Sequence, residues 1–166
     1  MLMPEPTFRT QLRAFQDIHG GDPDPGFVAD LEFMENRDLD LSVRIGAMLG
    51  FNALLITIGT HPVSASPGAP LSLDAANQPL LTLASLVAVA PFVLASWLCL
   101  SALLVGEAFN PDRADADALR RSLLAAFIRS VDLQSRKLRL AVRATLSGGV
   151  TTLAVWGWIL AAKMLA

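Results

Sequence analysis

The amino-acid sequence predicts an all-α membrane protein with three transmembrane helices, a cytoplasmic N-terminus and amphipathic cytoplasmic helical extensions. Its composition is the first observation that predicts this class. Hydrophobic residues make up 53% of the 166 residues and charged residues only 17%, whereas charged residues are about 25% of an ordinary soluble domain. The second observation is that three stretches are apolar over the roughly 20 residues that a helix needs to cross a bilayer.

The three spans follow from the distribution of charge. The first, residues 41–64, carries no charge after Arg44. The second, residues 80–106, carries none, and its length allows the helix to tilt in the bilayer. The third covers residues 144–166. An external loop rich in proline and serine, residues 65–79, is expected to link the first two spans.

Basic residues indicate the orientation of these spans. Twelve of the thirteen Lys and Arg residues lie before the uncharged part of the first span, which begins at Ile45, or between the second and third spans, and cytoplasmic loops are the ones that collect such residues. The N-terminus is therefore expected inside and the C-terminus outside. Trp156 and Trp158 are expected to form an aromatic belt at the outer interface, with Lys163 extending outward beside them. Arginine outnumbers lysine eleven to two, a bias typical of GC-rich bacterial genomes, which suggests the bacterial cytoplasmic (inner) membrane.

Two cytoplasmic parts of opposite charge complete the predicted organisation. Residues 1–40 form an acidic helical arm with three basic and nine acidic side chains, a net charge of −6. Residues 107–143 form a basic helix, and its part from 120 to 143 has seven basic residues and one acidic residue, a net charge of +6. Its start signal is Asn110 followed by Pro111. Neither part contains a helix breaker near its span, so each helix is expected to continue into the membrane.

The basic helix is amphipathic. Its apolar face comprises Leu123, Phe127, Val131, Leu138 and Val142. Its basic face comprises Arg121, Arg129, Arg136, Arg139 and Arg143. That basic face is expected to lie on anionic lipid, to meet a partner, or simply to be solvated.

Several residues inside the spans predict helix packing or assembly. Asn52 lies about a third of the way into the bilayer, where an amide without a partner is costly. Its expected partners are polar residues of the third span, Ser147, Thr151 and Thr152, or Asn52 of a neighbouring subunit. Small residues let two helix backbones approach closely. The pair Gly46 and Gly50 and the set around Gly148 and Thr152 are therefore candidates for packing within the chain or between subunits of a homo-oligomer.

No residue pattern points to catalysis or to a cofactor. His19 and His61 are expected on opposite sides of the membrane, and a metal site needs convergent ligands. The sequence also has no phosphate-binding glycine loop, no nucleophile motif and no carboxylate pair within a span. We therefore expect a protein that is not an enzyme and that has no cofactor, no bound metal and no nucleic-acid partner.

Two stretches, "VRIGAMLGFNALL" and "RSVDLQSRKLRLAVRATLSGG", resemble small bacterial membrane effectors of cyclic-nucleotide antiphage signalling, of the Pycsar transmembrane type. The resemblance lies in Arg44 at the mouth of a span with Asn52 eight positions later, and in a basic helix that runs into the last span. It implies a cytoplasmic helical part that senses a nucleotide signal and spans that assemble to permeabilise the membrane.

The sequence thus leads to two functional hypotheses. The first is a non-enzymatic, self-associating inner-membrane protein that acts as a signal-responsive membrane effector or a pore-forming component. The alternative is a membrane anchor or accessory subunit whose cytoplasmic helices dock a soluble protein partner.

Overall fold

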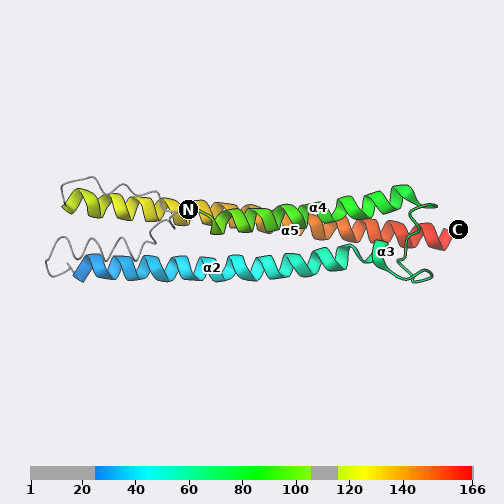
Figure 1. Ribbon diagram of the computed structural model, residues 1–166, viewed down its shortest axis with the longest axis horizontal. Helices are drawn as coiled ribbons and strands as arrows, with labels where there is room; N and C mark the ends of the chain where they lie inside the picture. The colour runs from blue at the N-terminus through cyan, green and yellow to red at the C-terminus, as the bar shows by residue number, and fades with distance from the viewer. Residues whose placement is uncertain (1–24, 106–115, 166) are drawn as a thin grey trace, which may run out of the picture. The chain divides into compact units, whose positions relative to one another are not determined.

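A computed structural model describes residues 25–105 and 116–165. These residues form helices joined by turns: α2 (Pro25–Gly59), α3 (His61–Ser64), α4 (Pro79–Leu103) and α5 (Ala116–Leu165) (Figure 1). Most of the predicted acidic arm and the helix start at Asn110 lie outside the described residues.

Three of these helices are long and apolar enough to cross a membrane, over Glu32–Gly59, Pro79–Leu103 and Leu124–Leu165. The chain is therefore a helical multi-pass membrane protein, as the hydropathy of the sequence predicts. Proline occupies the first position of α4, where its missing N–H costs nothing because a helix leaves its first amides unbonded. The helix ends at Leu103, three residues before the end of the predicted second span.

The two outer helices continue without a break beyond their apolar parts. α2 has 35 residues and α5 has 50, so the expected continuity of each helical extension with its span is observed over the described residues. Neither helix has an interior proline, which would remove a backbone hydrogen bond and break or kink the helix. The glycines inside them lower helix propensity but do not end the helix.

The chain divides into two compact units. The first comprises residues 1–41 and 105–133, and the second comprises residues 42–104 and 134–166. In the first unit Phe127 is buried, whereas Phe33, Leu39 and Ile128 are exposed. The second unit contains the central and C-terminal parts of the spans and is called the membrane unit below.

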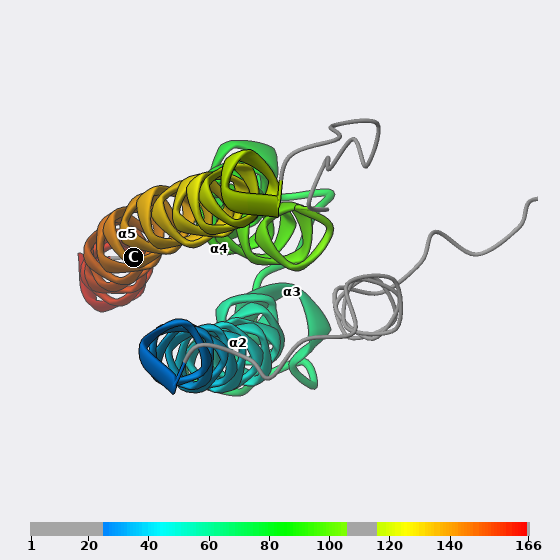
Figure 2. The ribbon, with the colours of Figure 1, turned by 90° about the vertical axis from the view of Figure 1, so that its left-hand side faces the viewer.

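Buried positions in the membrane unit are mostly small or polar. They are Ile45, Asn52, Gly59, Pro62, Ser72, Ser85, Ala88, Val89, Phe92, Ala95, Cys99, Ala102, Gln134, Ala141, Thr145, Gly148, Thr152 and Ile159. Large apolar side chains instead cover the outside of its three long helices, among them Leu54, Leu86, Leu94, Leu146 and Leu153. Figure 2 shows these helices end on. A water-soluble bundle has the opposite arrangement, so this surface is suited to lipid and the interior to close approach of backbones.

The helices of the membrane unit alternate in direction. α4 runs antiparallel to α5, because Phe92 packs on Gly148 while Ser101, nearer the end of α4, accepts a hydrogen bond from Lys137, nearer the start of α5 (2.7 Å). That bond places the ammonium group at the C-terminal end of α4, where carbonyl groups lack helical donors and the helix dipole is negative.

α2 runs parallel to α5. Asn52 meets Thr145, and the loop that follows α3 meets the end of α5, where Lys163 Nζ donates to the carbonyl of Ala69 (3.2 Å) and to Ser72 Oγ (3.4 Å). The two lysines of the sequence therefore tie α5 to the rest of the membrane unit. Lys137 lies near the start, and Lys163 near the end, of the part of α5 that belongs to this unit.

Candidate functional site

Asn52 is the most enclosed polar residue of the membrane unit, with none of its surface exposed. Its Oδ1 accepts a hydrogen bond from Thr145 Oγ1 at 2.8 Å. The same hydroxyl lies 3.0 Å from the carbonyl oxygen of Ala141, and a hydroxyl has a single hydrogen to donate. Asn52 Nδ2 is buried without a hydrogen-bond partner. The amide is thus held by one bond, which ties α2 to α5.

The sequence correctly directs Asn52 toward the third span but names the wrong residues there. Ser147 and Thr151 are exposed and donate to carbonyls of their own helix, those of Ala144 (2.8 Å) and Gly148 (3.0 Å). Thr152 is buried, yet it donates to Ala88 of α4 at 3.4 Å. Pairing with Asn52 of a neighbouring subunit does not fit a side chain that its own chain encloses fully.

Gly148 allows the closest approach between two helices in the membrane unit. A Cβ atom at this position would lie 2.7 Å from Cε1 of Phe92, a ring that is only 1% exposed. Gly59 plays a related part on α2, since its Cβ would lie 2.9 Å from Val89 Cγ2 and 3.9 Å from Phe92 Cε2. Phe92, the largest buried side chain, therefore occupies space that two glycines on two other helices leave open.

Gly59 is absent from the residues that the sequence singled out. A usable signal was its spacing: Ile45, Asn52 and Gly59 recur every seven residues, and all three are buried. Such a seven-residue repeat is typical of one helix face that packs along its neighbours.

Gly46 and Gly50 do not pack within the chain. Both are exposed, and a Cβ atom at either would meet nothing within 4 Å. Packing within the chain is therefore the wrong expectation for this pair. They lie one and five residues after Ile45, so the helical rotation of 100° per residue turns them away from the face that Ile45 and Asn52 share.

The outward surface of α2 is divided into two stripes of different size. The small stripe comprises Gly46, Gly50, Ala53 and Thr57, and the large stripe comprises Ala47, Phe51, Leu54 and Ile58. Each follows a spacing of four, three and four residues, which keeps its members on one side of a helix. All eight residues are exposed, so only the large stripe has the bulky apolar side chains that cover the rest of the lipid-facing surface.

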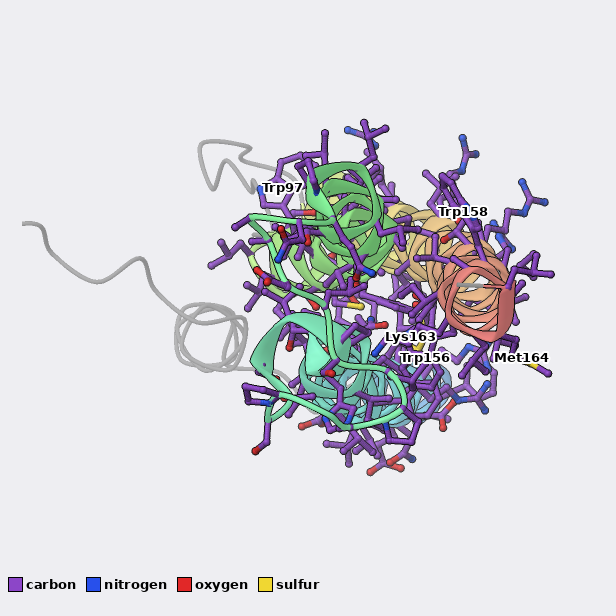
Figure 3. The ribbon with its side chains drawn as sticks, turned by 90° about the vertical axis from the view of Figure 1, so that its right-hand side faces the viewer. Trp97, Trp156, Trp158, Lys163 and Met164 are labelled. Carbon is purple, nitrogen blue, oxygen red and sulfur yellow. The ribbon has the colours of Figure 1, made fainter. Side chains whose placement is uncertain are left out.

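The side chains at the C-terminal end of α5 differ from the expected aromatic belt. In Figure 3 Trp158 and Met164 point outward, whereas Trp156 and Lys163 are turned toward the loop that follows α3. The indole N–H of Trp156 is buried, and Lys163 is bonded to that loop rather than extending outward. Trp158, which is 55% exposed, is thus the member of the pair that fits an interfacial belt.

The predicted basic face is exposed where it is described. Arg129, Arg136, Arg139 and Arg143 all lie on the surface of α5, whereas the side chain of Arg121 lies outside the described part. Of the predicted apolar face, Phe127 is buried but Val142 is 39% exposed. The reason is that beside lipid a large apolar side chain is as favourable outside as inside.

These helices and their packing define the class of the protein, a multi-pass helical membrane protein. Among the residues that the structure describes, no three His, Cys, Asp or Glu side chains come together as metal ligands. The chain matches no known protein family, no curated protein and no solved structure.

Proposed function

We propose that the protein is a non-enzymatic, self-associating protein of the bacterial cytoplasmic membrane that acts as a signal-responsive effector or a pore-forming component. The observation that carries this proposal is the small stripe of α2. Positions that face lipid gain nothing from glycine, whereas glycine and alanine at such spacing let a second helix approach closely enough for extensive van der Waals contact. Because none of the described residues covers Gly46 and Gly50, the partner that fits is another copy of the chain.

The small stripe allows a matched test of assembly. Gly50→Leu is expected to shift the protein from oligomer toward monomer in mild detergent, because the larger side chain keeps two backbones apart. Ala47→Leu adds bulk at an equally exposed position one turn away, on the large stripe, and is expected to leave the oligomer distribution unchanged. Native mass spectrometry measures both.

In cells, wild-type protein and Ala47→Leu are expected to depolarise the membrane when overexpressed, while Gly50→Leu is not. Equal oligomer distributions for the two variants would contradict the proposed interface.

The signal-responsive part of the proposal draws on the resemblance at Arg44 and Asn52 to effectors of cyclic-nucleotide signalling. The structure adds a reason why the spans would respond to a change elsewhere. Both α2 and α5 extend as unbroken helices from the membrane unit into the other unit. A rotation or shift imposed on the outer part of either helix would therefore be carried into its span.

A cytoplasmic N-terminus and an external C-terminus are the proposed orientation, supported by the count of basic residues. Reporter fusions test it. A reporter that is active only outside the cytoplasmic membrane is expected to be active when fused at Pro67 or after Ala166, and silent when fused at Ala116. The reverse pattern would overturn the assignment of the basic residues to the cytoplasm.

A membrane anchor or accessory subunit is the second candidate. It is favoured by exposed apolar residues in the first unit, Phe33 (70% exposed), Leu39 (62%) and Ile128 (56%), which would suit a soluble protein partner. An anchor differs from an effector in the depolarisation assay, because neither the wild-type protein nor its variants would alter the membrane potential.

A further inference from the structure

Three arginines of the membrane unit form a row on one side of α5. Arg136, Arg139 and Arg143 follow one another at spacings of three and four residues and are all exposed, so their guanidinium groups share one face of the helix. Ala141 and Thr145 are buried on the opposite face. The arginine row thus points away from α2 and α4, toward the surroundings of the bundle.

The depth of the arginine row follows from the sequence that comes after it. Residues 144–162 carry no charge, and these 19 residues of helix are about 29 Å long, which matches the roughly 30 Å hydrocarbon core of a bilayer. Arg143 therefore lies at the edge of the hydrocarbon. Arg139 lies about 6 Å further out, within the headgroup layer that adds roughly 5–8 Å on each side.

The packing of α2 against α5 brings a fourth arginine to the same depth. Because the two helices are parallel and Asn52 meets Thr145, Arg44, eight residues before Asn52, is level with Lys137, eight residues before Thr145. Lys137 donates to the carbonyl of Ser101, and Arg44 is exposed. Arginines of two helices, α2 and α5, thus lie at the end of the membrane unit where α2 enters.

Acidic residues are nearly absent from this unit. Asp74 is the sole Asp or Glu in residues 42–104 and 134–166, and it belongs to the loop at the other end of the spans. The nearest acidic residue along α5 is Asp132, one turn before Arg136, so Arg139 and Arg143 have no acidic residue within one turn of them on α5. At the opposite end of α5 the one basic residue, Lys163, is bonded to the protein itself.

We infer that the arginine row binds the headgroups of anionic phospholipids in the leaflet that surrounds this end of the bundle. Guanidinium groups pair with phosphate oxygens through two parallel hydrogen bonds, and those of Arg139 and Arg143 lie at the depth of lipid phosphates. An acidic protein would have to reach them within the headgroup layer, which favours lipid as the ligand. The inference does not depend on self-association, because the row lies on α5 and the small stripe on α2.

The test compares lipid binding by purified full-length protein and by Arg139→Gln/Arg143→Gln. Delipidated protein in neutral detergent is titrated with phosphatidylglycerol or phosphatidylcholine, and bound lipids are counted by native mass spectrometry. Wild-type protein is expected to prefer phosphatidylglycerol, and the double variant is expected to lose about 25-fold of that preference, since each basic residue near an anionic surface is worth roughly five-fold. Arg139→Lys/Arg143→Lys is expected to retain most of it, and Lys163→Gln all of it.

Three outcomes would overturn the inference. Equal preference in wild type and the double Gln variant would show that the arginines do not bind the lipid. Displacement of phosphatidylglycerol by millimolar inorganic phosphate would indicate a site for free anions. Unchanged lipid preference together with a loss of oligomers would assign the arginines to a protein contact.

Discussion

Gly148→Ala is expected to destabilise the membrane unit, although alanine is the better helix former. The added Cβ atom would lie 2.7–3.0 Å from three ring atoms of Phe92, and that ring is almost fully buried between α2, α4 and α5. Overfilling a packed interior costs about 1–3 kcal/mol, and the gain in helix propensity from replacing glycine returns roughly 0.5–1 kcal/mol. Unfolding by titration with a denaturing detergent measures the balance.

The neighbouring glycine supplies the control. A Cβ atom at Gly149 meets nothing within 4 Å, so Gly149→Ala keeps the propensity gain without the clash and is expected to equal or exceed wild type in stability. The free energies of unfolding of the two variants should therefore differ by about 1–3 kcal/mol. Phe92→Leu is expected to restore part of the stability lost in Gly148→Ala, because the smaller side chain frees the space. If both alanine variants are equally stable, Phe92 does not depend on Gly148 for room.

Hydropathy and helix breakers were enough to predict the elements of this fold. The uncharged stretches identify three spans because a bilayer demands a fixed length of apolar helix, and the absence of breakers before Ile45 and between Ala116 and Gly148 predicts helices that extend past the membrane. The predicted positions of the helix ends were less accurate. α2 stops at Gly59 and α4 at Leu103, before the predicted spans end, because the uncharged residues that identify a span continue beyond each helix.

The rotation of each helix was harder to predict. In a soluble bundle the apolar face identifies the core, but a span is apolar all round, so Gly46 and Gly148 look equivalent in the sequence. The structure separates them: Gly148 meets Phe92, whereas Gly46 faces outward. Burial in the membrane unit follows small size and polarity rather than hydrophobicity, and the seven-residue recurrence of Ile45, Asn52 and Gly59 was one sequence pattern that marked an inner face.

The register between helices could not be read from the sequence either. Counting from the first uncharged residue of each span, Ile45 and Ala144, pairs Asn52 with Thr151, but the hydrogen bond joins it to Thr145, six residues earlier. A predicted start reports where charge ends, not where the helices pack. The part of α5 that packs in the membrane unit begins before its basic residues end, and it includes Arg136, Lys137, Arg139 and Arg143. Long basic side chains allow this, because they can extend from a packed helix to the membrane interface.

Thr145→Val is expected to lower the stability of the membrane unit by about 1–3 kcal/mol. Valine has nearly the shape of threonine, so packing is preserved and the main loss is the hydrogen bond to Asn52, whose amide is left without any partner in a fully buried position. Hydrogen bonds between spans are themselves worth about 0.6 kcal/mol on average and up to about 1.7. Thr145→Val is expected to cost more than that average, because it leaves the buried amide of Asn52 without a hydrogen bond.

Replacing both partners separates these two contributions. In Asn52→Val/Thr145→Val no polar group remains to be satisfied, and such paired replacement is close to neutral when the shapes fit, so the double variant is expected to be more stable than Thr145→Val alone. Thr151→Val is the matched control, because its exposed hydroxyl bonds only to its own helix, and it should stay within about 0.5 kcal/mol of wild type. Asn52→Val alone completes the double-mutant cycle, and denaturing-detergent titration of wild type, both single variants and the double variant gives the coupling energy. Equal stability of Thr145→Val and Thr151→Val would mean that the bond between Asn52 and Thr145 does not hold α2 against α5.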